Sequence, residues 1–124
     1  MSGIDFFVDT NILLYIMDGR PELSAVSQFS HAISVITEVE LLGKKDITPS
    51  EVITIRSLLN NCSIASFNDT IKDIAISIKQ KYTVKIPDAI IVATAKFYEL
   101  PLVTADMDLK KIKGVDIVIL DLKN

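Results

Sequence analysis

FFVDTNILLYI, at residues 6–16, joins two different hydrophobic patterns. Ile4–Val8 form a short, mostly apolar run that is typical of a buried strand. Thr10–Met17 then predict a helix, and any of the three polar residues at positions 9–11 can cap its first turn. A strand that is followed directly by a helix is the repeating unit of a parallel α/β fold.

The alternation of strand and helix continues along the rest of the chain. Further strands are expected at His31–Val35, Ser63–Phe67, Leu102–Thr104 and Val115–Leu120. Further helices are expected at Pro21–Gln28, at Thr37–Gly43, from Thr48 to Asn60, from Asn68 or Asp69 to Tyr82, at Pro87–Tyr98 and at Met107–Lys111. The sequence therefore predicts an α/β protein. We expect a three-layer α/β/α sandwich with a central, mostly parallel sheet, and residues 1–124 forming a single domain.

The composition is that of a globular protein. Hydrophobic residues make up 49% of the 124 positions and charged residues 23%, which argues against disorder. No apolar run approaches the ~20 residues that a membrane span requires, and the start of the chain lacks a signal-peptide pattern. We therefore expect a cytoplasmic protein with no membrane partner.

The charge and the rare residue types exclude several kinds of site. The formal net charge of −3 does not favour a nucleic-acid partner, although five lysines can form a local basic rim or simply face water: Lys44, Lys45, Lys110, Lys111 and Lys113. Cys62 and His31 are the only residues of their types, so the sequence predicts neither a disulfide, nor a zinc site, nor a catalytic triad.

Four acidic residues stand near the expected junctions of strands and helices: Asp9, Glu40, Asp88 and Asp106. The carboxyl ends of parallel strands crowd onto one edge of a sheet, so these distant residues are expected to converge. Carboxylates that converge repel one another, and a hard divalent cation such as Mg²⁺ relieves that repulsion. The pattern predicts a catalytic metal site. Asp108 stands two residues beyond Asp106, and the short polar residues Asn11 and Thr104 can orient the carboxylates or a water molecule.

Each acid also has a purely structural interpretation. Asp9 and Asp106 can cap the helices that follow them, and Asp88 suits the positive end of a helix dipole. Thr37 and Glu40 have the spacing of a capping box, in which Glu40 would only bind a backbone N–H. The joint pattern favours the metal site, because caps do not need a carboxylate at every helix start.

Four blocks resemble the signature motifs of PIN domains, in the same order: DTNILLY, SVITEVELLG, PDAIIVATA and LVTADMDL. The resemblance runs from about Phe7 to about Leu120 and is closest to the small VapC-type toxins of toxin–antitoxin pairs. Carried over by position, the family's acidic quartet falls on Asp9, Glu40, Asp88 and Asp106. Asp108 matches a position that is often acidic, and Asn11 and Thr104 match polar positions beside the site.

The resemblance implies an activity and partners. It implies a PIN-type fold and a metal-dependent endoribonuclease that uses one or two Mg²⁺ or Mn²⁺ ions. It also implies an RNA substrate, a small antitoxin partner and a homodimer. Asp9, Asp88 and Asp106 would hold the principal ion, and Glu40 would bind it or orient the attacking water.

Two other classes of protein stay open. A haloacid-dehalogenase-type phosphatase needs an Asp-x-Asp pair after its first strand, where this chain has Asp9-Thr10-Asn11, and a receiver domain fits no better. A non-catalytic module is the second alternative, in which the acids bind a structural ion or none while the domain docks a partner.

Overall fold

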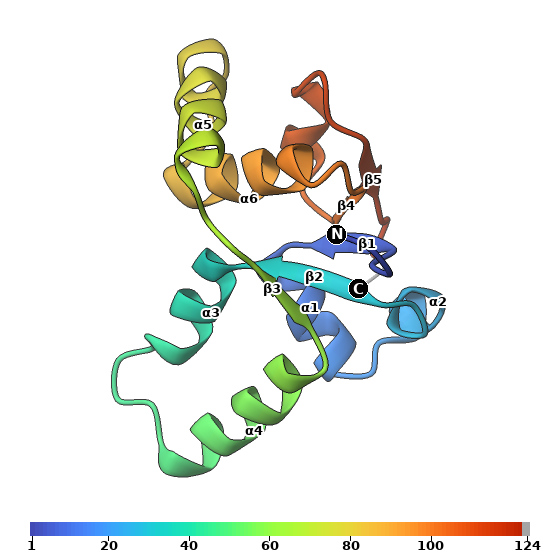
Figure 1. Cartoon of the computed structure of the whole chain (residues 1–124). Helices are drawn as coiled ribbons and strands as arrows, with labels where there is room; N and C mark the ends of the chain where they lie inside the picture. Colours follow the sequence, from blue (N-terminus) through green and yellow to red (C-terminus); the bar gives the residue numbers. More distant parts are fainter. Residues whose placement is uncertain (123–124) are drawn as a thin grey trace.

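A five-stranded sheet forms the centre of the computed structural model, which describes residues 1–122 (Figure 1). Its strands are β1 (Phe6–Val8), β2 (His31–Ser34), β3 (Ser63–Ala65), β4 (Leu102–Thr104) and β5 (Ile117–Ile119). They lie in the order β3-β2-β1-β4-β5, and every pairing within the described residues is parallel. The α/β fold with a mostly parallel sheet is therefore confirmed.

The helices follow the predicted alternation closely. They are α1 (Thr10–Met17), η1 (Pro21–Leu23), α2 (Ser24–Ser27), α3 (Val35–Leu42), α4 (Pro49–Asn60), α5 (Asp69–Lys81), α6 (Ile86–Phe97) and η2 (Met107–Lys111), where η marks a 3₁₀ helix. The bounds of α1 and of β4 are as predicted. The helix expected over Pro21–Gln28 is instead a 3₁₀ turn that leads into one turn of α-helix.

The start of α3 differs from the prediction. Thr37 was expected to begin this helix, but the side chain of Ser34 accepts a hydrogen bond of 3.0 Å from the backbone N–H of Ile36. The helix therefore starts at Val35, directly after β2. Glu40 consequently lies well inside α3 and not at its first turn.

The helices cover both faces of the sheet, as the three-layer prediction requires (Figure 1). Along β1, Phe7 joins a core with α5 and α6, whereas Val8 joins a second core with α1, α3 and α4. Ala32 and Ile33 in β2 divide between the two cores in the same way. This alternation follows from the two-residue period of a strand, and the parallel strands are apolar on both faces because both faces are covered.

The strand order reverses between β1 and β4. The chain moves outward from β1 through β2 to β3, then crosses back so that β4 pairs with the other side of β1. In sheets of this kind the connections leave the carboxyl ends of the two central strands in opposite directions and open a crevice between them. The residues that follow β1 and β4 flank this crevice.

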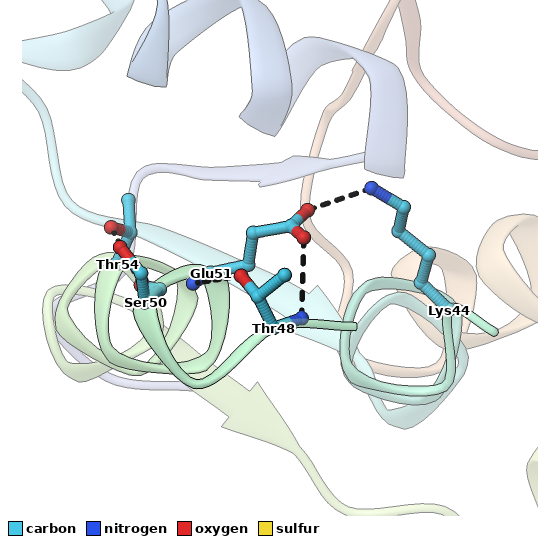
Figure 2. A network of polar contacts seen from close by, with 5 residues as sticks. All are labelled: Lys44, Thr48, Ser50, Glu51 and Thr54. Carbon is cyan, nitrogen blue, oxygen red and sulfur yellow. Dashed lines mark hydrogen bonds and ion pairs between the residues drawn. The ribbon is translucent and has the colours of Figure 1, made fainter. Parts of the chain in front are cut away.

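The helix expected from Thr48 to Asn60 is α4, and its start forms a capping box, shown in Figure 2. The backbone N–H of Glu51 donates to the Thr48 hydroxyl over 3.1 Å, and the Glu51 carboxylate accepts from the backbone N–H of Thr48 over 3.2 Å. Lys44 also donates to Glu51 over 2.7 Å. The bond from Lys44, followed by those with Thr48, lowers the pKa of the Glu51 carboxyl.

His31 and Cys62 take structural roles. His31 is buried at the start of β2, the end of the strand opposite to the crevice, and its Nδ1 lies 3.0 Å from the carbonyl oxygen of Phe29. Burial raises the pKa of the Cys62 thiol to about 11. In residues 1–122 every helix is too short or too polar to pass through a membrane.

Candidate metal-binding active site

Asp9 is the most buried acid of the site. It follows β1 and caps α1, because its Oδ1 accepts a hydrogen bond of 2.9 Å from the backbone N–H of Ile12. Its other oxygen, Oδ2, accepts a hydrogen bond of 2.5 Å from the hydroxyl of Thr104 at the end of β4. The carboxylate is therefore fixed from both sides of the crevice. It is a cap, as the structural interpretation predicted, and it is also buried in the crevice.

Thr104 connects Asp9 to Asp106. The Thr104 hydroxyl is fully buried, and it accepts a hydrogen bond of 3.1 Å from the backbone N–H of Asp106 while it donates to Asp9. Asp106 in turn caps η2, since its Oδ1 accepts from the backbone N–H of Asp108 over 3.0 Å. Thr104, which was expected to orient a carboxylate, thus contacts both Asp9 and Asp106. The carboxylates of Asp106 and Asp108 are both exposed.

Glu40 approaches the site from α3. Its Oε1 accepts a hydrogen bond of 2.7 Å from the hydroxyl of Thr10, the first residue of α1. The capping-box interpretation of Thr37 and Glu40 is wrong, because Thr37 lies inside the helix and its hydroxyl meets that of Thr10 at 2.9 Å. The Glu40 side chain is thus directed toward α1, beside Asp9.

Asp88 lies in the first turn of α6, where the helix dipole favours a negative charge. Asp88 is half-buried. The N-cap residue of the helix is Lys85, whose side chain makes no capping hydrogen bond. Asn11 differs from the other expected residues: it is exposed in the first turn of α1, and its side chain bonds to no residue of the described chain. The structure gives Asn11 no orienting contact.

The pKa values of Asp9 and Asp88 respond to the neighbouring carboxylates. Burial is the main cause that raises the pKa of Asp9; the bonds from Thr104 and Ile12 oppose it, and the charges of Asp106 and Glu40 add to it. Burial also leads in raising the pKa of Asp88. The charges of Asp106, Asp9 and Glu40 raise it further, against an opposing effect of Lys85. Residues up to 97 positions apart, Asp9 and Asp106, therefore share one electrostatic environment. We call Asp9, Glu40, Asp88 and Asp106 the acidic site.

The donor atoms of the acidic site are those that a hard cation prefers. Carboxylate oxygens bind Mg²⁺ and Mn²⁺, and a divalent ion would remove the mutual repulsion that raises the pKa values of Asp9 and Asp88. Within residues 1–122, however, no three carboxylate, imidazole or thiol groups stand close enough together to enclose an ion as they are placed. The chemistry of the site fits a divalent ion, and its side chains would have to close around it.

Sequence reasoning missed Thr10 and Thr37. The relevant signal was present, because Thr37 and Glu40 are three residues apart and so share a helix face. The same spacing also fits a capping box, and only the position of α3 against α1 distinguishes the two arrangements.

A groove opens beside Glu40, between α1, α3 and α4. It has a volume of about 440 Å³, and its apolar walls include Leu14, Met17, Leu41 and Ile55. Glu40 lies at one side of it, and Lys44, Ser50, Glu51 and Thr54 form a polar rim, part of which is drawn in Figure 2. We call it the α1–α3–α4 groove. A segment bound there would contact the acidic site.

Comparison with known proteins finds a matching family and similar structures. The model of the PIN domain matches residues 6–115. A solved toxin–antitoxin complex from Klebsiella pneumoniae contains a chain that is 32% identical, with a TM-score of 0.79, over 94% of this chain and 98% of that chain. A comparison with curated proteins returned no match.

Two more distant structures share the fold. DNA-bound VapBC from Salmonella typhimurium is 19% identical with a TM-score of 0.79, over 95% of this chain and 99% of that chain. VapBC2 from Rickettsia felis, bound to a promoter DNA fragment, is 20% identical with a TM-score of 0.76, over 95% of this chain and all of that chain (100%).

Proposed function

The chain belongs to the PIN domain family, and from this membership and its acidic site we propose that it is a metal-dependent endoribonuclease, the toxin of a toxin–antitoxin pair. The proposal is carried by one observation: Asp9, Glu40, Asp88 and Asp106 come from four separate elements, and the charges of Glu40 and Asp106 add to burial in raising the pKa values of both Asp9 and Asp88. Such a cluster is costly for a fold unless it binds a cation.

Asp9, Asp88 and Asp106 would hold the principal Mg²⁺ or Mn²⁺ ion, with Glu40 and Asp108 as further oxygen donors. A divalent ion bound there supplies a more acidic water molecule and offsets negative charge on the phosphate. The chain itself contributes by fixing the positions of the metal-binding carboxylates. Thr104 and the backbone of Ile12 hold both oxygens of Asp9, so this carboxylate presents a fixed direction to its ligand.

No side-chain nucleophile is needed for phosphodiester hydrolysis by activated water. The single histidine and the single cysteine take no part, since His31 is at the opposite end of β2 and the raised pKa of Cys62 keeps its thiol protonated. Glu40, exposed and bonded to Thr10, is the carboxylate that we assign to orienting the attacking water.

The replacement Asp88→Asn tests the proposal. We expect it to abolish RNA cleavage in Mn²⁺, a loss of more than about 100-fold, because it removes a charged oxygen donor from the site. Asp73→Asn, on the exposed side of α5, is the matched control and should cleave like the parent. Cleavage is followed on a mixture of RNAs, and circular dichroism checks the fold.

Two results would contradict the assignment. If Asp88→Asn cleaves RNA as well as the parent, the site is misplaced. If calorimetry shows tight Mn²⁺ binding while the parent cuts none of a diverse set of RNAs, the non-catalytic module is the better description.

The antitoxin partner is part of the same proposal. The Klebsiella pneumoniae relative comes from a toxin–antitoxin complex, and the α1–α3–α4 groove gives a small partner protein an apolar surface that ends at Glu40. Expression of the chain alone should arrest bacterial growth, and the Asp88→Asn variant at equal abundance should not. Growth unaffected by the parent would argue against a toxin.

We further propose that the protein is a homodimer, that it is cytoplasmic and that residues 1–124 form a single domain. The last is supported by the two cores, which lie on opposite faces of the same sheet in the described residues.

A further inference from the structure

Two threonines connect α1 to α3 beside the acidic site. The Thr10 hydroxyl lies 2.7 Å from Glu40 Oε1 and 2.9 Å from the Thr37 hydroxyl. Thr37 is completely buried, whereas Glu40 is exposed. The chain of contacts therefore runs from the interior of the protein to a carboxylate at the surface.

The direction of the hydrogen bonds follows from counting protons. An ionised carboxylate only accepts, so the single hydroxyl proton of Thr10 goes to Glu40. The proton in the bond between the two hydroxyls must then come from Thr37. Thr37 donates to Thr10, and Thr10 donates to Glu40, in one fixed order.

The behaviour of Thr37 is unusual for a helical threonine. A buried threonine in a helix commonly donates to the carbonyl of the preceding turn. Thr94 in α6 does so, with 2.6 Å between its hydroxyl and the carbonyl oxygen of Ile90, and it is as buried as Thr37. Thr37 instead directs its proton across to α1. Its hydroxyl serves a contact between elements, and that contact ends on Glu40.

We propose that Thr10 and Thr37 are positioning residues that hold the Glu40 carboxylate beside the other acids of the acidic site. The inference rests on the proposed ribonuclease function, since it assigns a task to Glu40 in that reaction. A glutamate on an exposed helix face has many rotamers, and fixing it by a donor that is itself fixed removes that freedom before substrate arrives. Thr104 does the same for Asp9, so both carboxylates beside α1 are held by threonine hydroxyls.

Isosteric and conservative replacements of Thr10 and Thr37 separate the effect of the hydroxyl from the effect of the rest of the side chain. Valine keeps the shape and removes the proton, while serine keeps the hydroxyl. We expect Thr10→Val to lower kcat about 10-fold with little change in KM for RNA, as is usual when a supporting hydrogen bond to a site residue is lost. Thr37→Val should lower kcat less. Thr10→Ser and Thr37→Ser should retain the parent's rate.

Thr94→Val is the matched control. It removes an equally buried hydroxyl from a residue outside the site, so it should change the denaturation midpoint and leave kcat unchanged. A second control is the double variant. In a Glu40→Ala background, Thr10→Val should have no further effect on kcat, because residues that act through one another are not additive.

A readout that does not need activity is the ¹³C chemical shift of the Glu40 carboxylate. It should move in Thr10→Val and stay in place in Thr10→Ser. If the parent cleaves RNA and Thr10→Val cleaves equally well, the positioning role is overturned and the ribonuclease function stands. If the parent cleaves nothing, the proposed function fails, and an unmoved Glu40 shift in Thr10→Val would overturn the hydroxyl chain itself.

Discussion

Asp9 illustrates the conflict between stability and chemistry at the scale of one residue. Its carboxylate is 8% exposed, and burial together with the charges of Asp106 and Glu40 raises its pKa. The folded protein therefore favours the protonated form more than the unfolded chain does. A metal ligand must be ionised, so the fold maintains Asp9 in an environment that disfavours the form it needs.

Replacement of Asp9 by asparagine should stabilise the metal-free protein at neutral pH. Because the folded-state pKa of Asp9 is raised, its stabilising contribution is complete below the ordinary value of 3.8 and is lost as pH rises through the raised value. The advantage of Asp9→Asn over the parent should therefore be absent at pH 3 and grow toward pH 7, as measured by urea denaturation in EDTA. Asp116→Asn, an exposed control, should show no such trend.

Added Mn²⁺ should make the parent more stable than Asp9→Asn. An ion at about 100 times its dissociation constant adds about 2.7 kcal/mol to the stability of the state that binds it. The parent should gain this amount and Asp9→Asn much less. Equal stabilisation of both proteins by Mn²⁺ would show that Asp9 is not a ligand.

The thiol of Cys62 gives an independent check on burial. With a pKa of about 11, roughly one thiol in a thousand is ionised at pH 8. Iodoacetamide should therefore modify Cys62 about 100-fold more slowly than a free cysteine, as followed by intact-protein mass spectrometry. Modification at the rate of a free thiol would mean that the segment around Cys62 opens readily.

The sequence pattern marks the acids and Thr104, whereas it does not mark Thr10 and Thr37 as groups that contact Glu40. Asp9 and Asp106 stand at junctions of strand and helix, and the parallel fold brings such junctions to one edge. Asp88 was expected at such a junction too, but it starts a helix that follows another helix, α5, so this rule does not place it. No such rule predicts where the hydroxyl of Thr37 lies. Its partner depends on how α3 is rotated against α1, which is decided by packing of the surrounding side chains.

At the scale of elements, the predicted types were correct and the ends were less so. The strand expected over Ser63–Phe67 ends at Ala65, and that expected over Val115–Leu120 covers only Ile117–Ile119. β1 at the centre of the sheet is shortened in the same way, from the expected Ile4–Val8 to Phe6–Val8, so position at an edge is not the cause. Hydrophobic pattern alone does not reveal where the pairing between strands stops.

Thr48 should matter more to α4 than the ion pair beside it. Thr48→Ala removes the side-chain cap and should cost about 1 kcal/mol of unfolding free energy in urea. Lys44→Ala breaks the exposed contact with Glu51 and should leave the midpoint unchanged within error, because surface ion pairs contribute little. The reverse ranking would show that the charge and not the cap stabilises this helix.

At the scale of the molecule, the sheet order was beyond the sequence. Alternating strands and helices predict parallel pairing, but the position of β4 beside β1 depends on one long crossover that no local pattern marks. This strand order decides how the acidic site is assembled, because Asp9 and Asp106 flank the crevice only when β1 and β4 are neighbours.

The second face of the molecule carries an apolar opening between α5 and α6, with a volume of about 420 Å³. We call it the α5–α6 groove. Phe67, Ile76 and Ile86 line it and are 47%, 49% and 64% exposed. Large exposed apolar surfaces are typical of contacts between proteins. We predict that a second copy of the chain docks on this surface in the proposed homodimer.

The replacement Ile76→Lys tests the dimer. It should convert a dimeric parent to a monomer in sedimentation equilibrium, because it places a charge in the α5–α6 groove. Ile53→Lys, on an even more exposed isoleucine of α4, is the control and should leave the assembly unchanged. A parent that sediments as a monomer at all concentrations would refute the homodimer.

The hydrogen bond between Thr104 and Asp9 spans 95 residues, and this has a consequence for synthesis on the ribosome. A nascent chain that has not yet released residues 102–106 lacks β4, one of the two strands that pair with β1, and also lacks Thr104 and Asp106. Truncated products and stalled translation intermediates would thus have an incomplete acidic site. Under the proposed function, a competent nuclease would form only after residues 102–106 have left the ribosome.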